Sequence, residues 1–256
     1  EIAKISHTKA VMFGFWRYKK PQTFALTLTV GPWTIDQVVA IPYPVQHQQQ
    51  VVCNLSWTSD GTITDHGGYL VVTNGTQTTV TATVKTEPFV SSSDQPMIRQ
   101  CYDETIATLH YGAPIPGLYS LADAQRLPEV DCGGFSVYLL SLLAAANVEA
   151  RLVAGFWAGY PENSMHAWVE THLPDGSWLP LDPSTDWLRQ RRRTKKMGGY
   201  GELGSDRIVI SVDSDHVIQH QAQTYAVGML QWPMLLQSDG QFTYLDAVTQ
   251  VLTKRQ

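Results

Sequence analysis

The sequence predicts an α+β fold, and three observations lead to this prediction. From residue 9 to residue 90 the chain is rich in threonine, valine and aromatic residues and is broken by turn residues at short intervals. Residues 97–146 carry apolar residues at helical spacing, and residues 164–184 have the pattern of two short strands joined by a turn. We therefore expect a β-domain followed by a core in which helices pack on an antiparallel sheet.

The first part of the chain has the strand spacing that is typical of a β-sandwich or a β-barrel. Its clearest strand-like runs are residues 23–30, 51–57, 69–72 and 78–84. Asn74-Gly75 separates the last two runs and predicts that they pair as a hairpin. The strongest change of composition falls at residues 87–96, so we expect an N-terminal β-domain of residues 1–90 and a catalytic domain of residues 91–256.

Three helices are expected in the second domain, over residues 97–110, 118–124 and 135–146. Asp131 is a good candidate for the N-cap of the last helix, and Asn147 is a plausible stop. Two further strands are expected at residues 206–213 and 241–251. The order of the core is thus helix, helix, helix and then an antiparallel sheet.

Cys132 lies where the third expected helix begins. A thiol in the first turn feels the unpaired N–H groups and the positive end of the helix dipole, and both favour the thiolate form that attacks carbonyl groups. Cys132 is therefore a candidate nucleophile at a helix N-terminus. The alternative is a small buried residue that behaves as a hydrophobe.

A predicted hairpin supplies two possible partners for this cysteine. His166 is near the start of a strand-like run, Asp182 is at the end of the next run, and Pro174-Asp175-Gly176 forms the turn between them. A hairpin can bring a histidine and an acid side by side, although these residues are 16 positions apart in the chain. A cysteine, a histidine and an acid could then converge, as thiol chemistry requires.

Four motifs in one order resemble the transglutaminase-like superfamily in its bacterial and archaeal branch. They are Asp-Cys-Gly-Gly-Phe-Ser from residue 131, Val-Glu-Ala-Arg-Leu-Val-Ala-Gly-Phe from residue 148, His-Ala-Trp-Val-Glu from residue 166, and Gly-Ser-Trp-Leu-Pro-Leu-Asp-Pro-Ser from residue 176. The resemblance covers roughly residues 95–220. It implies a papain-like or transglutaminase-like core with Cys132 as nucleophile, His166 as base and acid, and Asp182 as the residue that orients His166.

The residues that would bind the substrate are less sharply defined. The backbone N–H of Cys132 or Gly133 could stabilise an oxyanion, and the two glycines after the cysteine either admit a substrate or allow close packing. In the family a tryptophan upstream of the cysteine often completes the oxyanion hole, but none occurs between Trp57 and Trp157. Tyr111 or Tyr119 could take its place. Trp168 shares a strand face with His166 and either packs beneath the site or contacts substrate.

Composition and cysteine spacing exclude several other classes of function. The formal net charge of −5 and the pI near 5.9 leave no footprint for nucleic acid binding. Three scattered cysteines and the lack of a calcium-loop pattern predict no metal site and no cofactor. No apolar run is long enough to span a membrane. We expect a cytoplasmic protein, with a signal peptide removed before Glu1 as the alternative.

The expected function is that of a thiol enzyme with a Cys-His-Asp triad, acting through an acyl-enzyme on Cys132. Its substrate would be a peptide or protein, and hydrolysis by a cysteine protease or amidase comes first because water is the easier acceptor to supply. A transamidase or acyltransferase that uses an amine, and a scaffold that keeps the fold without turnover, are the alternatives. The basic stretch 189–196 is expected to be a solvated loop, with a docking site for an acidic partner as the alternative.

Overall fold

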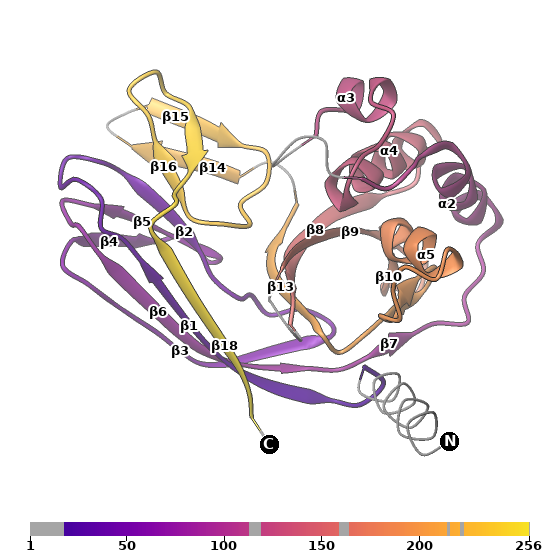
Figure 1. Cartoon of the computed structure of the whole chain (residues 1–256), viewed down its shortest axis with the longest axis horizontal. Helices are drawn as coiled ribbons and strands as arrows, with labels where there is room; N and C mark the ends of the chain where they lie inside the picture. Colours follow the sequence, from indigo (N-terminus) through magenta and orange to yellow (C-terminus); the bar gives the residue numbers. More distant parts are fainter. Residues whose placement is uncertain (1–17, 113–118, 159–163, 214–215, 221–222, 256) are drawn as a thin grey trace, which may run out of the picture. The chain divides into compact units, whose positions relative to one another are not determined.

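The computed structural model describes residues 18–112, 119–158, 164–213, 216–220 and 223–255 (Figure 1). The chain divides into two compact units, and neither is continuous in the sequence. The helical unit comprises Glu1–Pro21, Glu87–Val153 and His166–Arg207. The β unit comprises Gln22–Thr86, Ala154–Met165 and Ile208–Gln256.

Two antiparallel sheets make up most of the β unit. The first has the order β18-β1-β6-β3 and is formed by β1 (Gln22–Val30), β3 (Gln50–Ser59), β6 (Thr78–Thr86) and β18 (Val248–Arg255). The second has the order β17-β16-β2-β5-β4 and is formed by β2 (Val39–Pro42), β4 (Thr62–Asp65), β5 (Tyr69–Thr73), β16 (Met234–Leu236) and β17 (Phe242–Tyr244). A separate hairpin joins β14 (His216–His220) to β15 (Gln223–Val227).

The two sheets of the β unit share one hydrophobic core. Burial alternates along β1, so that Leu28 and Val30 lie on its inner face. These two residues belong to the same cluster as Ile41 from β2 and Leu70 and Val72 from β5. Side chains of two sheets that meet in one core define a face-to-face packing of the sandwich type.

The predicted hairpin at Asn74-Gly75 is wrong. Strand β5 pairs with β2 and β4, whereas β6 pairs with β1 and β3, so the turn carries the chain from one sheet to the other. Asn74 has a positive φ of 54°, as such a turn requires, and a Cβ added to Gly75 would lie 2.6 Å from the Cα of Gly61. An Asn-Gly turn supplies the required backbone conformation, but it does not determine which strands pair.

The single strand predicted for residues 241–251 is also wrong. Those residues contribute to two strands in different sheets, β17 and β18, and β18 pairs with β1 from Val248↔Val30 to Arg255↔Thr23. The compact units therefore group residues 208–256 with residues 22–86, a division different from the expected domains 1–90 and 91–256. Strand pairing between distant parts of a chain leaves no local signal in composition.

The helical unit contains the segment that carries the candidate site. Its helices are α2 (Pro96–Thr108), α3 (Leu121–Arg126), α4 (Cys132–Ala145) and α5 (Pro183–Gln190). Its strands are β7 (Phe89–Val90), β8 (Ala150–Trp157), β9 (Ser164–His172), β10 (Trp178–Leu181), β11 (Gly198–Gly199) and β12 (Glu202–Leu203). The sheet has the order β10-β9-β8-β13, where β13 is Arg207–Val212. The end of β8 from Ala154 and the part of β13 from Ile208 belong to the β unit.

Helix α4 packs on the sheet of the helical unit (Figure 1). Leu139 and Leu143 of α4 share a buried cluster with Val169 of β9 and Leu179 and Leu181 of β10. The helix is apolar nearly all round, which suits a helix buried against a sheet. This packing fixes the start of α4 relative to the hairpin that carries the candidate histidine and acid.

The three helices expected from the sequence are present as α2, α3 and α4, and the β9-β10 hairpin pairs as expected. The fourth helix, α5, is an addition to the expected elements. It begins at Pro183, and the side chain of Asp182 accepts a hydrogen bond from the backbone N–H of Thr185 as its N-cap. A capping acid followed by proline is a recognised helix start, so the signal is present in the sequence. In the described part of the chain, no helix is long and apolar enough to cross a bilayer.

Candidate active site

Cys132 is the first residue of α4, as the sequence predicts. Asp131 caps the helix, and its Oδ1 accepts hydrogen bonds from the backbone N–H groups of Gly133 at 2.7 Å and Gly134 at 3.4 Å. Gly134 also packs closely against Val130, since an added Cβ would lie 2.4 Å from the Cβ of that residue. The cap and this close approach together fix the position of the cysteine at the helix start.

The thiol of Cys132 lies directly beside the residue that follows His166. The backbone N–H of Ala167 forms a hydrogen bond to it, and the residue as a whole is half-buried. Burial raises the pKa of this thiol to about 12, and the nearby carboxylates of Asp131 and Asp182 act in the same direction. The thiolate expected at the helix start is therefore disfavoured, because desolvation and the two acids outweigh the hydrogen bonds from the backbone N–H groups of Ala167 and Gly133.

The structure brings His166 and Asp182 together. Nε2 of His166 lies 2.9 Å from Oδ2 of Asp182, and both side chains are almost completely buried. His166 comes from β9, and Asp182 follows the last residue of β10 and caps α5. Because an ionised carboxylate can only accept hydrogen bonds, Nε2 carries the proton and Nδ1 of the neutral ring is left as the basic nitrogen.

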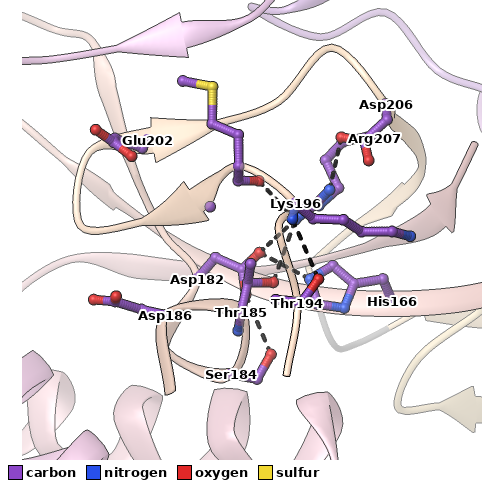
Figure 2. A network of polar contacts seen from close by, with 12 residues as sticks. His166, Asp182, Ser184, Thr185, Asp186, Thr194, Lys196, Glu202, Asp206 and Arg207 are labelled. Carbon is purple, nitrogen blue, oxygen red and sulfur yellow. Dashed lines mark hydrogen bonds and ion pairs between the residues drawn. The ribbon is translucent and has the colours of Figure 1, made fainter. Parts of the chain in front are cut away.

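Four donors surround the Asp182 carboxylate (Figure 2). Oδ1 accepts from the N–H of Thr185 at 3.1 Å and the hydroxyl of Ser184 at 3.2 Å. Oδ2 accepts from His166 and from Nη2 of Arg207, which is 3.0 Å away. Burial opposes the charged form, but His166, Arg207 and Thr185 outweigh it and hold the pKa of Asp182 well below its usual range.

The imidazole of His166 is kept neutral by its surroundings. Burial lowers its pKa, Asp182 acts in the opposite direction, and the cations of Arg207 and Lys196 lower it further. The ring stacks on Trp168 with centroids 5.9 Å apart and an angle of 25° between the planes. Burial of both groups therefore favours a protonated thiol beside a neutral imidazole.

The predicted substrate-binding residues occupy three different environments. The N–H of Gly133 is taken up by the cap of Asp131. Trp168 is fully buried and contacts His166, and Tyr119 is buried just before the cap of α3. Tyr111 interacts with Cys132: burial is the largest cause that raises the pKa of Tyr111, and Cys132 and Asp131 add to the rise.

Sequence reasoning missed the charged groups near the His166–Asp182 pair. Arg207 and Asp206 are fully buried and paired with each other at 2.8 Å. Lys196 is half-buried in the same region. Burial is the main cause that lowers the pKa of Lys196 to about 8; Asp206 opposes this shift, and Arg207 adds to it. A charged pair at the start of an otherwise apolar strand, Asp206-Arg207-Ile208-Val209-Ile210, was the available signal.

The basic stretch 189–196 is anchored in several places. Arg189 bonds the carbonyl of Gly198 and pairs with Glu202. The Arg191 guanidinium lies 3.8 Å from the centroid of the Trp187 ring. Arg193 donates to the carbonyl of Tyr111 at 3.3 Å and lies over the rings of Tyr111 and Trp187. Cation–π contacts and hydrogen bonds to backbone carbonyl groups thus hold part of the stretch next to Tyr111.

The three cysteines are all free; Cys101 is buried, and Cys53 and Cys132 are half-buried. Among the residues that the structure describes, no group of three or more histidine, cysteine, aspartate or glutamate side chains is arranged to hold a metal ion.

Comparison with known proteins gives the family of the matched segment. Residues 89–183 match the model of the transglutaminase-like superfamily, and this range includes Cys132, His166 and Asp182. The resemblance inferred from the sequence motifs is confirmed, and this segment belongs to the transglutaminase-like superfamily. No curated protein matches the sequence.

Solved structures similar to the chain include a bacterial protein and a periplasmic domain. A "Putative Cysteine Protease from Cytophaga hutchinsonii" has 13% sequence identity and a TM-score of 0.51, with 92% of this chain and 98% of that chain covered. At this identity the likeness is one of fold. The periplasmic domain of TgpA from Pseudomonas aeruginosa has 16% sequence identity and a TM-score of 0.33, with 71% of this chain and 93% of that chain covered.

Proposed function

We propose that this chain is a thiol enzyme that cleaves amide or peptide bonds, with Cys132 as nucleophile, His166 as base and acid, and Asp182 as the residue that orients His166. The single observation that carries the proposal is the buried 2.9 Å contact between His166 and Asp182, next to the cysteine that starts α4. The match to the transglutaminase-like superfamily over all three residues supports it.

The first half of the reaction forms a thioester. As the sulfur of Cys132 attacks the substrate carbonyl carbon, Nδ1 of His166 takes the thiol proton, and Asp182 stabilises the resulting imidazolium through Nε2. The carbonyl oxygen becomes an oxyanion, for which we propose the backbone N–H of Cys132 as a donor, since the first N–H of a helix has no partner within the helix. The C–N bond then breaks, and the leaving amine takes the proton from His166.

The second half releases the acyl group. In hydrolysis, His166 removes a proton from water, the hydroxyl oxygen attacks the thioester carbon, and the thiol of Cys132 leaves with the proton from His166. In transamidation an amine takes the place of water. We place hydrolysis first because water always reaches a site that admits substrate, and because the 189–196 stretch next to Tyr111 is cationic, which disfavours a protonated amine.

The experiment is intact-mass analysis of wild type, Cys132→Ala and His166→Ala after incubation with p-nitrophenyl acetate or a peptide panel, with and without a primary amine. The proposal predicts an acyl adduct or turnover that is lost in both variants. A free acid as the main product supports hydrolysis, and an amide of the added amine supports transamidation. An adduct pattern that is the same in wild type and Cys132→Ala contradicts the enzyme and favours a scaffold role.

A further inference from the structure

A buried arginine outside the family-matched segment contacts the candidate acid. Arg207 begins β13, and the match to the superfamily ends at residue 183. Its guanidinium is 1% exposed and Nη2 lies 3.0 Å from the Oδ2 of Asp182, the same oxygen that bonds His166. The guanidinium of Arg207 and the imidazole of His166 therefore share one carboxylate oxygen.

The guanidinium is fixed from several directions (Figure 2). Nη2 also donates to the carbonyl of Met197 at 3.0 Å and the hydroxyl of Thr185 at 3.3 Å, and Nη1 donates to Oδ1 of Asp206 at 2.8 Å. Space around the contact is closed, since a Cβ added to Gly198 would lie 2.8 Å from Oδ2 of Asp182 and 3.0 Å from Nη2 of Arg207. A planar fork held at both ends can hold a carboxylate in one orientation, which a flexible ammonium group cannot.

We propose that Arg207 is a positioning residue for the reaction: it locks the Asp182 carboxylate in the orientation that accepts from His166 and offsets its negative charge, so that His166 rests as a neutral base. The inference rests on the proposed function, because it assigns His166 the role of base. Asp206 completes the arrangement, because its Oδ1 accepts from Nη1 of Arg207 and holds the other end of the guanidinium.

Two consequences separate this role from simple packing. The first is electrostatic: a cation at Oδ2 weakens the attraction between Asp182 and an imidazolium, and Arg207 is among the groups that lower the pKa of His166. The second is geometric: Oδ2 has to accept from two donors at once, so loss of one allows the carboxylate to turn. The charged and titratable groups that interact with His166, Asp182 or Cys132 are Asp131, Tyr111, Asp186, Lys196, Arg207 and Tyr102. Asp206 acts on Lys196 and pairs with Arg207.

The first test is an NMR titration of the His166 ring in a Cys132→Ala background, which removes the titrating thiol. Arg207→Gln keeps a polar side chain but removes the cation, and it is expected to raise the pKa of His166. Arg207→Lys keeps the cation and is expected to restore most of the original value. Arg189→Gln is the matched control, because Arg189 bonds Gly198 and Glu202 without contacting Asp182, and it should leave the titration unchanged.

A charge-balanced variant covers the case in which Arg207→Gln fails to fold. Asp206→Asn/Arg207→Gln removes one charge of each sign, so that the buried site keeps its net charge. The pKa of His166 is still expected to rise, because Arg207 donates to the Asp182 carboxylate, whereas Asp206 accepts from the other end of the guanidinium. A folded variant with an unchanged His166 titration overturns the proposal.

The second test measures the acylation of Cys132 by p-nitrophenyl acetate, taken as the rate of each protein minus that of its Cys132→Ala form. In this step the sulfur bonds the acetyl carbon, p-nitrophenolate leaves, and His166 takes the thiol proton. A misplaced base is expected to slow the step about 100-fold in Arg207→Gln. Arg207→Lys should restore the pKa of His166 more fully than the acylation rate, because lysine restores the positive charge but not the planar guanidinium.

The two proposals fail in different ways. If wild type shows no acylation that depends on Cys132, the proposed function fails, and the titration still decides whether Arg207 controls His166. If wild type acylates and Arg207→Gln does so at the same rate with the same His166 pKa, the positioning role fails and the enzyme stands. If the rate falls while the pKa of His166 stays unchanged in both Gln variants, Arg207 has a packing role only, and the proposal is overturned.

Discussion

The starts of α4 and α5 look alike in the sequence and differ in the folded chain. Each helix is capped by an aspartate, Asp131 for α4 and Asp182 for α5, and each carboxylate accepts a backbone N–H of the first turn. Burial raises the pKa of Asp131, whereas His166 and Arg207 overcome burial and lower that of Asp182. The same local role thus gives opposite electrostatic behaviour.

The two acids differ in the partners that the rest of the chain brings to them. Asp131 has only its own helix start as hydrogen-bond partner among the contacts described, and its function is to fix the position of Cys132. Asp182 accepts hydrogen bonds from His166 of β9, 16 residues before it in the chain, and from Arg207 of β13, 25 residues after it. Distant segments, and not the cap itself, make one of the two acids a candidate for catalysis.

The largest expected difference comes from the same substitution at both caps. Asp182→Asn keeps a capping side chain but loses the charge that orients His166, so acylation by p-nitrophenyl acetate should fall by up to about 10⁴-fold. Asp131→Asn keeps the cap of α4, since asparagine is an equally good N-cap, and should change the rate by no more than about threefold. Equal losses in the two variants would show that the caps, and not the His166 contact, control the reaction.

Alanine at the two caps should separate them in stability. Asp131→Ala removes a helix cap and is expected to lower the free energy of unfolding by about 1 kcal/mol. Asp182→Ala leaves Arg207 buried with one carboxylate fewer and should cost about 3–5 kcal/mol. Urea denaturation followed by circular dichroism measures both values. A smaller loss for Asp182→Ala than for Asp131→Ala would mean that the buried Arg207 contact does not stabilise the fold.

The dependence of stability on pH should have opposite signs for the two acids. The lowered pKa of Asp182 contributes stability above its unfolded pKa of about 3.9, and this is lost as the pH falls toward the folded value. The raised pKa of Asp131 means that its charge opposes folding at neutral pH and that acid relieves the penalty. Melting temperatures between pH 7 and pH 3 should therefore fall less steeply in Asp182→Asn and more steeply in Asp131→Asn than in wild type.

The smallest expected effect is on the thiol. Because burial and nearby acids raise the pKa of Cys132, its alkylation by iodoacetamide should increase steadily from neutral pH to pH 10. Asp131→Asn removes one of those acids and should speed alkylation at pH 8.5 by about threefold, while Asp131→Glu keeps the charge and serves as the control. Peptide mapping distinguishes Cys132 from Cys53 and Cys101. A rate that is constant from pH 5 to pH 8 would indicate a preformed thiolate–imidazolium pair instead.

Much of the helical unit follows from local sequence. The cap at Asp131, the apolar run after Cys132 and the turn before Trp178 predict the start of α4 and the β9-β10 hairpin. The Asp-Pro start of α5 carries an equally local signal, but a proline after an aspartate is also compatible with an extended strand end. In the β unit, by contrast, Asn74-Gly75 predicts a hairpin that does not form, because a turn fixes local φ and ψ values but not the partners of the strands it joins.

The sequence by itself determined the candidate catalytic residues, since the motifs at Cys132, His166 and Asp182 depend on residue type, caps and strand periodicity within short segments. Only the tertiary structure decided their electrostatic state. Burial raises the pKa of the Cys132 thiol, and Arg207 reaches Asp182 from a strand that begins 25 residues further along the chain. Desolvation and charge pairing depend on distances in space, and a chain read residue by residue does not contain those distances.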